Sequence, residues 1–436
     1  MNSRLSSCNL LHRLPRARLS LLRELGILAD EQGAVLYLVG GVVRDLLLKR
    51  KNWDLDLTVE GDGIAFAQLV ANVYRADLAL FERFATARLT LPSGVKLDIA
   101  TTRRESYATP GALPDVRPAS LDQDLYRRDF TINAMAIELN ARRFGILHDS
   151  YGGRRDLKAK TIRVLHDKSF VDDPTRVFRA IRFAERFGFR LEVNTARLLK
   201  DAAATDAIAR LSGPRLCNEI LLLSGESHPK RSFASLARLQ LLRFLHPNLS
   251  YTRSAKRTVR SLSKALGWWA RNCRRHPISR QLVYLMALLD GVEQSVVEAV
   301  VARLMLSNEQ AAKVRAGGNR LENVVHALAH AQRMKQSEIY RCLSGLPDEA
   351  LVLCLARTTG QAVALARMKR RMLDYLNKLS KIKPVLRGDD LLQLGIKRGP
   401  AVGALLVALL EAKLDGAIKT RRDEQTFVRR HLAKTS

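Results

Sequence analysis

Hydrophobic positions in the first third of the chain follow two periods. In short runs they alternate, which predicts strands because neighbouring side chains of a strand point to opposite faces. Between these runs they recur every three to four residues, as on one face of a helix. The expected strands are residues 35–39, 55–59, 87–91, 95–100 and 134–139, and the expected helices are residues 42–49 and 64–74. The turn residues at 92–94 predict a hairpin between two of the strands.

From Asp173 to the C-terminus, nearly every stretch follows the helical period, with Pro, Gly or Ser between the segments. A chain of 436 residues is too long for a single hydrophobic core. The pattern therefore predicts the α+β class, with a head built on a small mixed sheet and all-helical domains after it.

Charge narrows the class of partner. The chain has 73 Lys and Arg against 43 Asp and Glu, a net charge of +30, which a polyanion such as nucleic acid would balance. No apolar run is long enough to span a bilayer, so a membrane is not the expected partner. Five scattered cysteines without a CxxC pair indicate a reducing compartment. The Arg- and Ser-rich start, before Glu24, fits an organellar transit peptide or a basic N-terminal helix, and we favour the helix and a bacterial cytoplasmic enzyme.

A Gly-Gly turn followed by a pair of carboxylates is the most informative feature of the sequence. Gly40 and Gly41 lack a Cβ, so their backbone can approach a phosphate, and Arg44 can add a forked donor. Asp54 and Asp56 lie two apart on an expected strand, so their side chains share a face. Like charges held this close repel unless a cation lies between them, and Mg²⁺ with a substrate phosphate is the natural guest. This pattern predicts metal-dependent nucleotidyl transfer.

Two further groups of polar residues fit such a reaction. Asp98, on another alternating strand, is the candidate third carboxylate, acting as base or metal ligand. In the stretch RRDFTINA, Arg128 and Asp129 are neighbours that could together satisfy the hydroxyls of a ribose, with Asn133 nearby. The Pro- and Gly-rich residues 101–121 predict a mobile loop over the site.

A third group lies on an expected helix that begins near Pro174. Asp173 lies near its N-cap, and arginines follow at every third position: Arg176, Arg179 and Arg182. Three arginines behind a capping Asp suggest guanidinium groups directed at phosphate and base edges.

These motifs together resemble those of a known family. LVGGVVRDLLLKRKNWDLDLT at residues 38–58, RRDFTINA at 127–134 and DDPTR at 172–176 resemble motifs of the class II nucleotidyltransferases that add CCA to tRNA 3′ ends, and of the related bacterial poly(A) polymerases. The resemblance implies a polymerase-β-like catalytic head followed by helical neck, body and tail domains. The expected boundaries are a basic helical segment (1–32), head (33–165), neck (166–235), body (236–350) and tail (351–436).

The resemblance also implies roles for these residues. Asp54 and Asp56 would hold Mg²⁺, Gly41 and Arg44 would hold the triphosphate, and Arg128 would contact the nucleotide with Asp129 and Asn133 near its ribose. Asp173 and Arg176 would select cytosine and adenine without a nucleic-acid template, and Arg179 and Arg182 would hold the triphosphate or stiffen that pair. The implied reaction adds CMP and AMP from CTP and ATP to the 3′ end of tRNA and releases pyrophosphate.

Several alternatives remain open. Within the family they are CC addition only, A addition only and poly(A) synthesis, and outside it a non-catalytic RNA-binding protein on the same fold. Side chains expected to hold the tRNA backbone, at its acceptor arm and elbow, lie near the C-terminus: Lys369, Arg370, Arg371, Lys381, Lys383 and Arg387. Trp268 and Trp269, in a basic stretch, fit either a stacking platform or helix packing.

Overall fold

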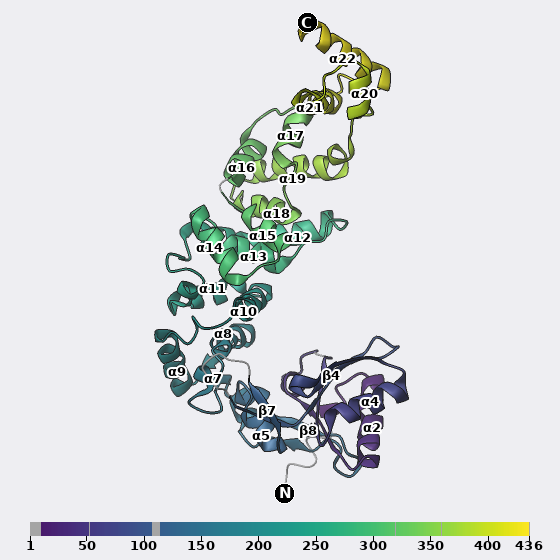
Figure 1. The fold of residues 1–436 in the computed structure, drawn as a ribbon. Coiled ribbons are helices and arrows are strands. Elements are labelled where there is room, and N and C mark those ends of the chain that lie inside the picture. Colours follow the sequence, from purple (N-terminus) through teal and green to yellow (C-terminus); the bar gives the residue numbers. More distant parts are fainter. Residues whose placement is uncertain (1–9, 52, 107–113, 319, 359, 436) are drawn as a thin grey trace. The chain divides into compact units, whose positions relative to one another are not determined.

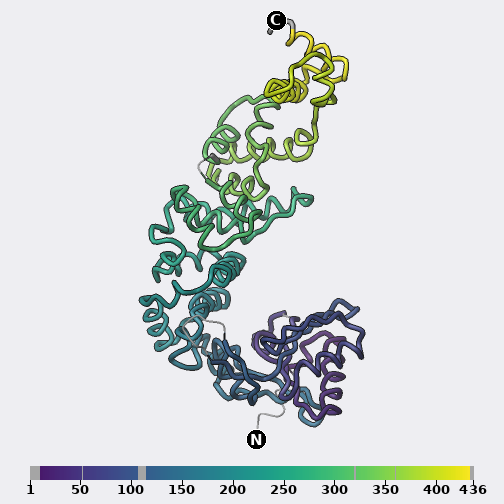
Figure 2. The backbone as a smooth tube through the Cα atoms, in the orientation of Figure 1, coloured from purple at the N-terminus to yellow at the C-terminus, as the bar shows by residue number. Residues whose placement is uncertain are grey.

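The computed structural model describes residues 10–51, 53–106, 114–318, 320–358 and 360–435. Figures 1 and 2 trace the chain from its N-terminus in purple to its C-terminus in yellow. The chain divides into two compact units. The N-terminal unit holds residues 1–219, 226–228 and 238–244, and the C-terminal unit holds residues 220–225, 229–237 and 245–436. The expected loop at residues 101–121 is described only in part, because residues 107–113 lie outside the described ranges.

A mixed sheet of seven strands is the framework of the N-terminal unit. Its order is β3-β4-β5-β2-β1-β8-β9, and β2 and β5 run parallel while the other neighbours are antiparallel. The strands are β1 (Val35–Val39), β2 (Leu55–Glu60), β3 (Asp77–Phe81), β4 (Thr86–Thr90), β5 (Lys96–Thr101), β8 (Ala136–Glu138) and β9 (Leu147–His148). The predicted hairpin between β4 and β5 is confirmed.

Two strand pairs lie outside this sheet. β6 (Arg103–Ser106) and β7 (Asp115–Pro118) form an antiparallel pair within the stretch expected to be a loop. β10 (Thr161–Ile162) and β11 (Arg190–Leu191) form a short parallel pair. Because β11 follows the start of the helical region, the prediction of helices alone after Asp173 is wrong at these two residues.

Helices and short 3-10 turns complete the N-terminal unit, and several of the helices contact strands of the sheet. They are α2 (Arg16–Glu31), α3 (Gly41–Leu47), α4 (Gly63–Tyr74), α5 (Leu121–Tyr126), α6 (Gly153–Lys158), α7 (Ser169–Asp172), α8 (Thr175–Phe187), α9 (Val193–Ala204) and the first part of α10 (Gly213–Gly225), with 3-10 turns η1 (Glu82–Phe84), η2 (Thr131–Asn133), η3 (Ala141–Arg143) and η4 (Leu241–Phe244). Asp62 caps α4 by accepting a hydrogen bond from the Ala65 N–H. Gly188 ends α8 in the left-handed conformation (φ 67°).

The alternation of the strands separates core from site. Leu55 and Leu57 of β2 are buried, as are Leu97 and Ile99 of β5. The intervening residues of both strands therefore emerge on the opposite face of the sheet. That face carries Asp56.

The C-terminal unit consists of helices in its described residues (Figure 1). They include α11 (Pro229–Arg238, of which residue 238 belongs to the N-terminal unit), α12 (Arg253–Asn272), α13 (Arg280–Leu288), α14 (Gln294–Leu304), α15 (Asn308–Arg315), α16 (Arg320–His330), α17 (Gln336–Leu343), α18 (Asp348–Arg357), α19 (Ala362–Asn377), α20 (Gly388–Gln393), α21 (Pro400–Leu414) and α22 (Arg421–Thr435), with a 3-10 turn η5 (Leu379–Lys381). The predicted α+β class is thus confirmed. Across the described ranges, no helix is long and apolar enough to cross a membrane.

Candidate active site

The Gly-Gly turn joins β1 to α3. Gly40 has a positive φ of 72°, which favours glycine, and a Cβ there would lie 2.9 Å from Nη1 of Arg128. Arg44, on α3, is buried. Its Nε and Nη2 donate to the carboxylate of Asp45 (3.0 and 2.9 Å), and its Nη1 donates to Oδ1 of Asn133 (2.6 Å). The guanidinium expected to bind phosphate is therefore held in a fixed orientation at the turn.

The parallel pairing of β2 and β5 brings carboxylates together. Asp56 and Asp98 are register partners on the two strands. Burial, and then the negative charges of Asp98 and Asp54, raise the pKa of Asp56 to about 6 against the opposing effect of Arg128. Asp54 is exposed just before β2 begins. The structure thus places Asp98 beside Asp56, and the charge of Asp54 acts on Asp56 as well.

Arg88, which the sequence analysis did not single out, faces Asp98 from the neighbouring strand β4. Its Nε lies 2.7 Å from Oδ1 of Asp98, in an ion pair whose side chains are 57% and 48% exposed. Solvent screens such a pair, so it orients Asp98 more than it stabilises the fold.

Asp129 and Arg128 have different partners in this structure, and their expected joint contact with a ribose stays a prediction. Arg128 pairs with the buried Asp124 (Nη2 to Oδ2, 2.8 Å). Asp129 accepts from Nε and Nη2 of Arg179 (2.8 and 2.6 Å) and from Nδ2 of Asn133 (2.8 Å). Burial alone would raise the pKa of Asp129, but the charge of Arg179 and these hydrogen bonds hold it below its usual range.

The predicted helix after Pro174 is confirmed as α8, and Asp173 precedes it. One carboxylate oxygen of Asp173, Oδ1, accepts from the Thr175 N–H (3.0 Å) and from Nη2 of Arg215 (2.8 Å). Its other oxygen, Oδ2, lies 4.0 Å from Nε of Arg176, which is beyond hydrogen-bond distance. Arg176 is buried and donates to Oγ of Ser169 (2.8 Å) and to the carbonyl of Arg127 (2.6 Å).

Arg182, the third arginine of the predicted row, lies in a buried acidic setting. It lies near the carboxylates of Glu219 (3.8 Å) and Glu226 (3.7 Å), and its Nε makes no hydrogen bond within the described residues. Burial lowers the pKa of Arg182 and raises that of Glu219.

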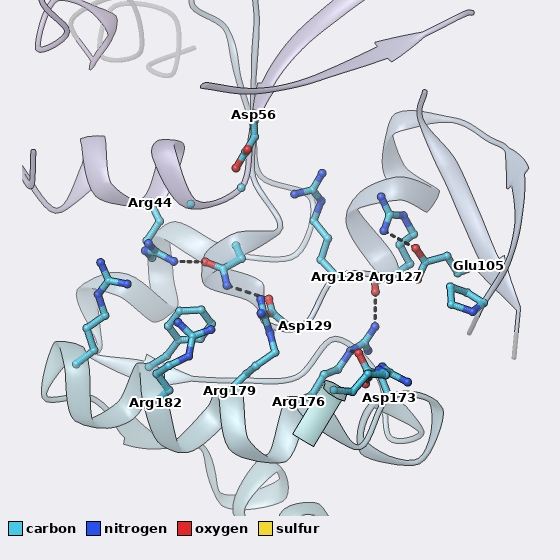
Figure 3. Close-up of a pocket in the computed structure, with 17 residues that line it drawn as sticks. Arg44, Asp56, Glu105, Arg127, Arg128, Asp129, Asp173, Arg176, Arg179 and Arg182 are labelled. Carbon is cyan, nitrogen blue, oxygen red and sulfur yellow. Dashed lines mark hydrogen bonds and ion pairs between the residues drawn. The ribbon is translucent and has the colours of Figure 1, made fainter. Parts of the chain in front are cut away.

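Many of these side chains line one cavity of about 530 Å³ (Figure 3). Of the predicted site residues, those that line it are Gly40, Gly41, Arg44, Asp56, Arg128, Asp129, Asn133, Asp173, Arg176, Arg179 and Arg182. Asp54 and Asp98 are not among them, and Asp98 instead lines a second cavity that Asp56 and Arg128 share. In Figure 3, Asp56 lies across the cavity from the arginines of α8.

The cavity also has wall residues that the sequence analysis missed: Glu105, Pro114, Arg127, Phe183, Arg186 and Arg215. The sequence could have indicated two of them as site residues. Arg127 adjoins Arg128, and Arg186 continues the helical row of arginines four residues after Arg182. It gave no such indication for Arg215 and Glu105, because only the tertiary fold brings them here. With eight arginines in its wall, the cavity suits a polyanion such as a triphosphate.

The expected RNA-binding side chains divide into two groups. Arg370, Lys381, Lys383 and Arg387 are exposed, and Lys369 is half-buried. Arg371 is 3% exposed, and its guanidinium donates to the carbonyls of Leu328 (2.8 Å) and Ala331 (2.8 Å) at the end of α16. Its prediction as a phosphate contact is therefore wrong, because its donors bond the end of a helix.

Family models match two parts of the chain. One is described as "Poly A polymerase head domain" and matches residues 36–163, and the other as "Probable RNA and SrmB- binding site of polymerase A" and matches residues 188–252. The A-adding tRNA nucleotidyltransferase of Geobacter sulfurreducens is 41% identical over 94% of this chain and 47% of its own length. This chain therefore spans about half the length of that relative. The A-adding tRNA nucleotidyltransferase of Halalkalibacterium halodurans is 35% identical over 96% of this chain and 93% of its own length.

Other relatives and solved structures that resemble this chain are also enzymes of this kind by name. Relatives with lower identity are named CC-adding tRNA nucleotidyltransferase and CCA-adding enzyme. A solved complex of the Thermotoga maritima CCA-adding enzyme with tRNA has a TM-score of 0.73 and 34% identity, and covers 98% of both chains. A complex of a CCA-adding enzyme with ATP has a TM-score of 0.80 and 35% identity, and covers 99% of both chains.

Proposed function

The chain belongs to the family of tRNA nucleotidyltransferases, and from that premise we propose that it adds nucleotides to the 3′ end of tRNA without a nucleic-acid template. One observation carries the proposal: a cavity walled by eight arginines opens beside Asp56, next to Asp98 on the adjoining strand. In the proposed reaction the terminal 3′-hydroxyl attacks the α-phosphorus of a nucleoside triphosphate, and pyrophosphate leaves.

Mg²⁺ is the proposed cofactor, and the chemistry of the carboxylates fits it. Asp54, Asp56 and Asp98 offer oxygen donors alone, as Mg²⁺ prefers, and their mutual repulsion favours a bound cation. Substrate phosphate and water would supply the remaining ligands of such an ion. Bound at Asp54 and Asp56, Mg²⁺ would lower the pKa of the attacking hydroxyl and neutralise developing charge.

The other side chains bind and orient the nucleotide in this proposal. Arg44, fixed by Asp45 and Asn133, presents its guanidinium beside the Gly-Gly turn for the triphosphate. Oδ2 of Asp173 would accept from the exocyclic amine that cytosine and adenine share, and Arg176 would donate to ring acceptors. The bonds that Arg176 makes to Ser169 and Arg127 hold it in place beside Asp173.

Addition of AMP is the activity that we propose first. The two relatives described above with 41% and 35% identity are both named A-adding enzymes. Full CCA addition is the second candidate, because CCA-adding enzymes solved with CTP and with ATP each match this chain at 35% identity over 99% of its length.

The decisive experiment offers the purified protein three tRNAs, which end before CCA, after the first C and after CC. Each receives Mg²⁺ with labelled CTP, labelled ATP or both, and an Asp54→Ala variant serves as the control. Incorporation of a single A into the CC-ended tRNA alone supports an A-adding enzyme, and extension of all three to CCA supports the full activity. Long A tails would identify a poly(A) polymerase, and absence of incorporation anywhere would refute nucleotidyl transfer.

A further inference from the structure

A long stretch of the chain outside the cavity carries positive charge alone. Between Glu226 and Asp290 the sequence has no acidic residue and 13 Lys and Arg residues. In the whole chain 43 of 436 residues are acidic, so about six would be expected in a stretch of this length. This stretch contains α12, the longest described helix of the C-terminal unit.

The cations of α12 lie on its exposed side. Its opposite face, which includes Val259 and Leu262, is buried where α12 packs against α13 and α18. The exposed basic side chains recur at helical spacing, and we call them the α12 basic face: Lys256, Arg257, Arg260, Lys264 and Arg271. Within the described residues none of these five makes an ion pair with a carboxylate. Two exposed arginines elsewhere in the same unit are paired, Arg315 with Glu298 (2.7 Å) and Arg341 with Glu411 (2.6 Å).

A groove of about 480 Å³ lies at the C-terminal end of this face. Lys264 and Arg271 of α12 line it together with Lys369 of α19, and Nζ of Lys369 lies 5.4 Å from the ring centre of Trp268. Trp268 is half-buried, whereas Trp269 is 2% exposed and donates from Nε1 to the carbonyl of His276 (2.9 Å). The two tryptophans therefore differ: Trp269 is a core residue and Trp268 belongs to the groove.

Gly267, inside α12, also lines the groove. A glycine inside a helix costs about 1 kcal/mol relative to alanine. A Cβ added at this position would have Nη1 of Arg271 as its nearest heavy atom, at 3.6 Å, which is an ordinary contact, so helix packing does not require glycine. The missing side chain leaves the groove open between Lys264 and Arg271.

We infer that the α12 basic face and this groove bind the phosphodiester backbone of RNA. Unpaired cations at helical spacing match a row of phosphates, and their binding would release counterions. The indole of Trp268 provides an apolar surface for a ribose or base between those phosphate contacts. The inference rests on the proposed function only in naming tRNA as the RNA to be tested.

The first test removes charge from the groove. Lys264→Gln combined with Arg271→Gln should weaken tRNA binding about tenfold near 0.1 M salt and flatten the plot of log Kd against log salt by about two. The matched control, Arg315→Gln combined with Arg341→Gln, removes the same charge from the same unit and should leave that slope unchanged. Fluorescence anisotropy with labelled tRNA gives both quantities. Equal slopes for the two double variants would overturn the inference.

The second test fills the groove without changing charge. Gly267→Leu should weaken tRNA binding several-fold while Tm stays the same or rises, because leucine is the better helix former. Wild-type affinity in this variant would also overturn the inference. Polyglutamate that competes as well as unlabelled RNA of equal charge would show attraction to any polyanion, which again contradicts an RNA site.

These binding tests do not depend on nucleotidyl transfer. If the protein binds tRNA through the groove and incorporates no nucleotide, the proposed function falls and the inference stands. If it incorporates nucleotides and the groove variants bind tRNA like their controls, the inference falls and the proposed function stands.

Discussion

The surroundings of Asp56 disfavour the ionised form of its carboxyl group, and a bound cation would favour that form. Its pKa of about 6 reflects burial and the nearby charges of Asp98 and Asp54. Asp56→Asn should therefore lower the single-turnover rate of nucleotide addition by at least about a hundredfold, since loss of a metal ligand removes several kcal/mol of transition-state stabilisation. Tm at pH 7 should be unchanged or higher, because a disfavoured charge is removed. A variant that keeps its rate, or that loses its rate only because it unfolds, would contradict this assignment.

The role of Asp98 can be separated from its ion pair with Arg88. Both side chains are largely exposed, so breaking the pair should cost at most about 1 kcal/mol of stability. If Asp98 serves the reaction, Asp98→Asn should lower the rate at least about tenfold, a difference of about 1.4 kcal/mol in the barrier. Arg88→Gln should stay within about threefold of the wild type. Equal and small effects of both variants would leave Asp98 as a surface ion-pair partner.

At the residue scale, the sequence could predict which side chains line the same site, but not which hydrogen-bond partners they have. Asp56 and the α8 arginines were predicted together, and they line one cavity. The bonds from Asp129 to Arg179 and from Asp173 to Arg215 join residues 50 and 42 positions apart, and no local pattern encodes them. Arg371 did carry a signal: it lies beside Met372 and three residues after Met368, on the buried side of α19.

At the scale of elements, the carboxylate of Glu424 joins α22 to the chain before α20 and to α21. Glu424 is fully buried; its carboxylate accepts from the Val385 and Leu386 N–H groups (2.8 Å each) and from Nζ of Lys413 (2.7 Å). Burial alone would raise its pKa, but these hydrogen bonds and the Lys413 charge lower it. A lowered folded-state pKa means that the ionised group stabilises the fold above its ordinary pKa of 4.5, and that this stability is lost as pH falls.

Glu424→Gln should therefore destabilise the protein by about 1 to 3 kcal/mol at pH 7. The gap in Tm between variant and wild type should narrow below pH 4.5, where the wild-type carboxylate loses this contribution. Thermal unfolding at several pH values measures both. Glu309→Gln is the control, because Glu309 pairs with Lys313 while 78% exposed and should change Tm little. A gap that widens in acid would contradict the assigned direction.

Elements with strong periodicity were predictable, and short or edge elements were not. β1 occupies the predicted residues 35–39, and α4 begins one residue before its predicted start. β3 was missed because, as an edge strand, it buries neither face fully, and its Phe81 remains 49% exposed. β10 and β11 have two residues each and pair across a separation of 29 positions, too short and too distant for any pattern.

Because the whole molecule has a net charge of +30, salt should have two opposite effects. It should raise the stability of the free protein and weaken its binding to tRNA. Positive side chains repel one another in the folded state, and salt screens that repulsion, so Tm without RNA should rise between about 50 and 200 mM salt. Over the same range tRNA affinity should fall at least about a hundredfold, because several phosphate contacts release counterions.

The two effects also predict how RNA changes stability. At about 50 mM salt, tRNA in excess over its Kd should raise Tm, because it binds the folded state and relieves its repulsion. At higher salt this increment should shrink as binding weakens, while the Tm of the protein alone climbs toward the same value. Scanning calorimetry with and without tRNA follows both curves. Parallel curves, or an affinity that does not respond to salt, would mean that the charge does not serve a polyanion and would remove the electrostatic basis for tRNA binding.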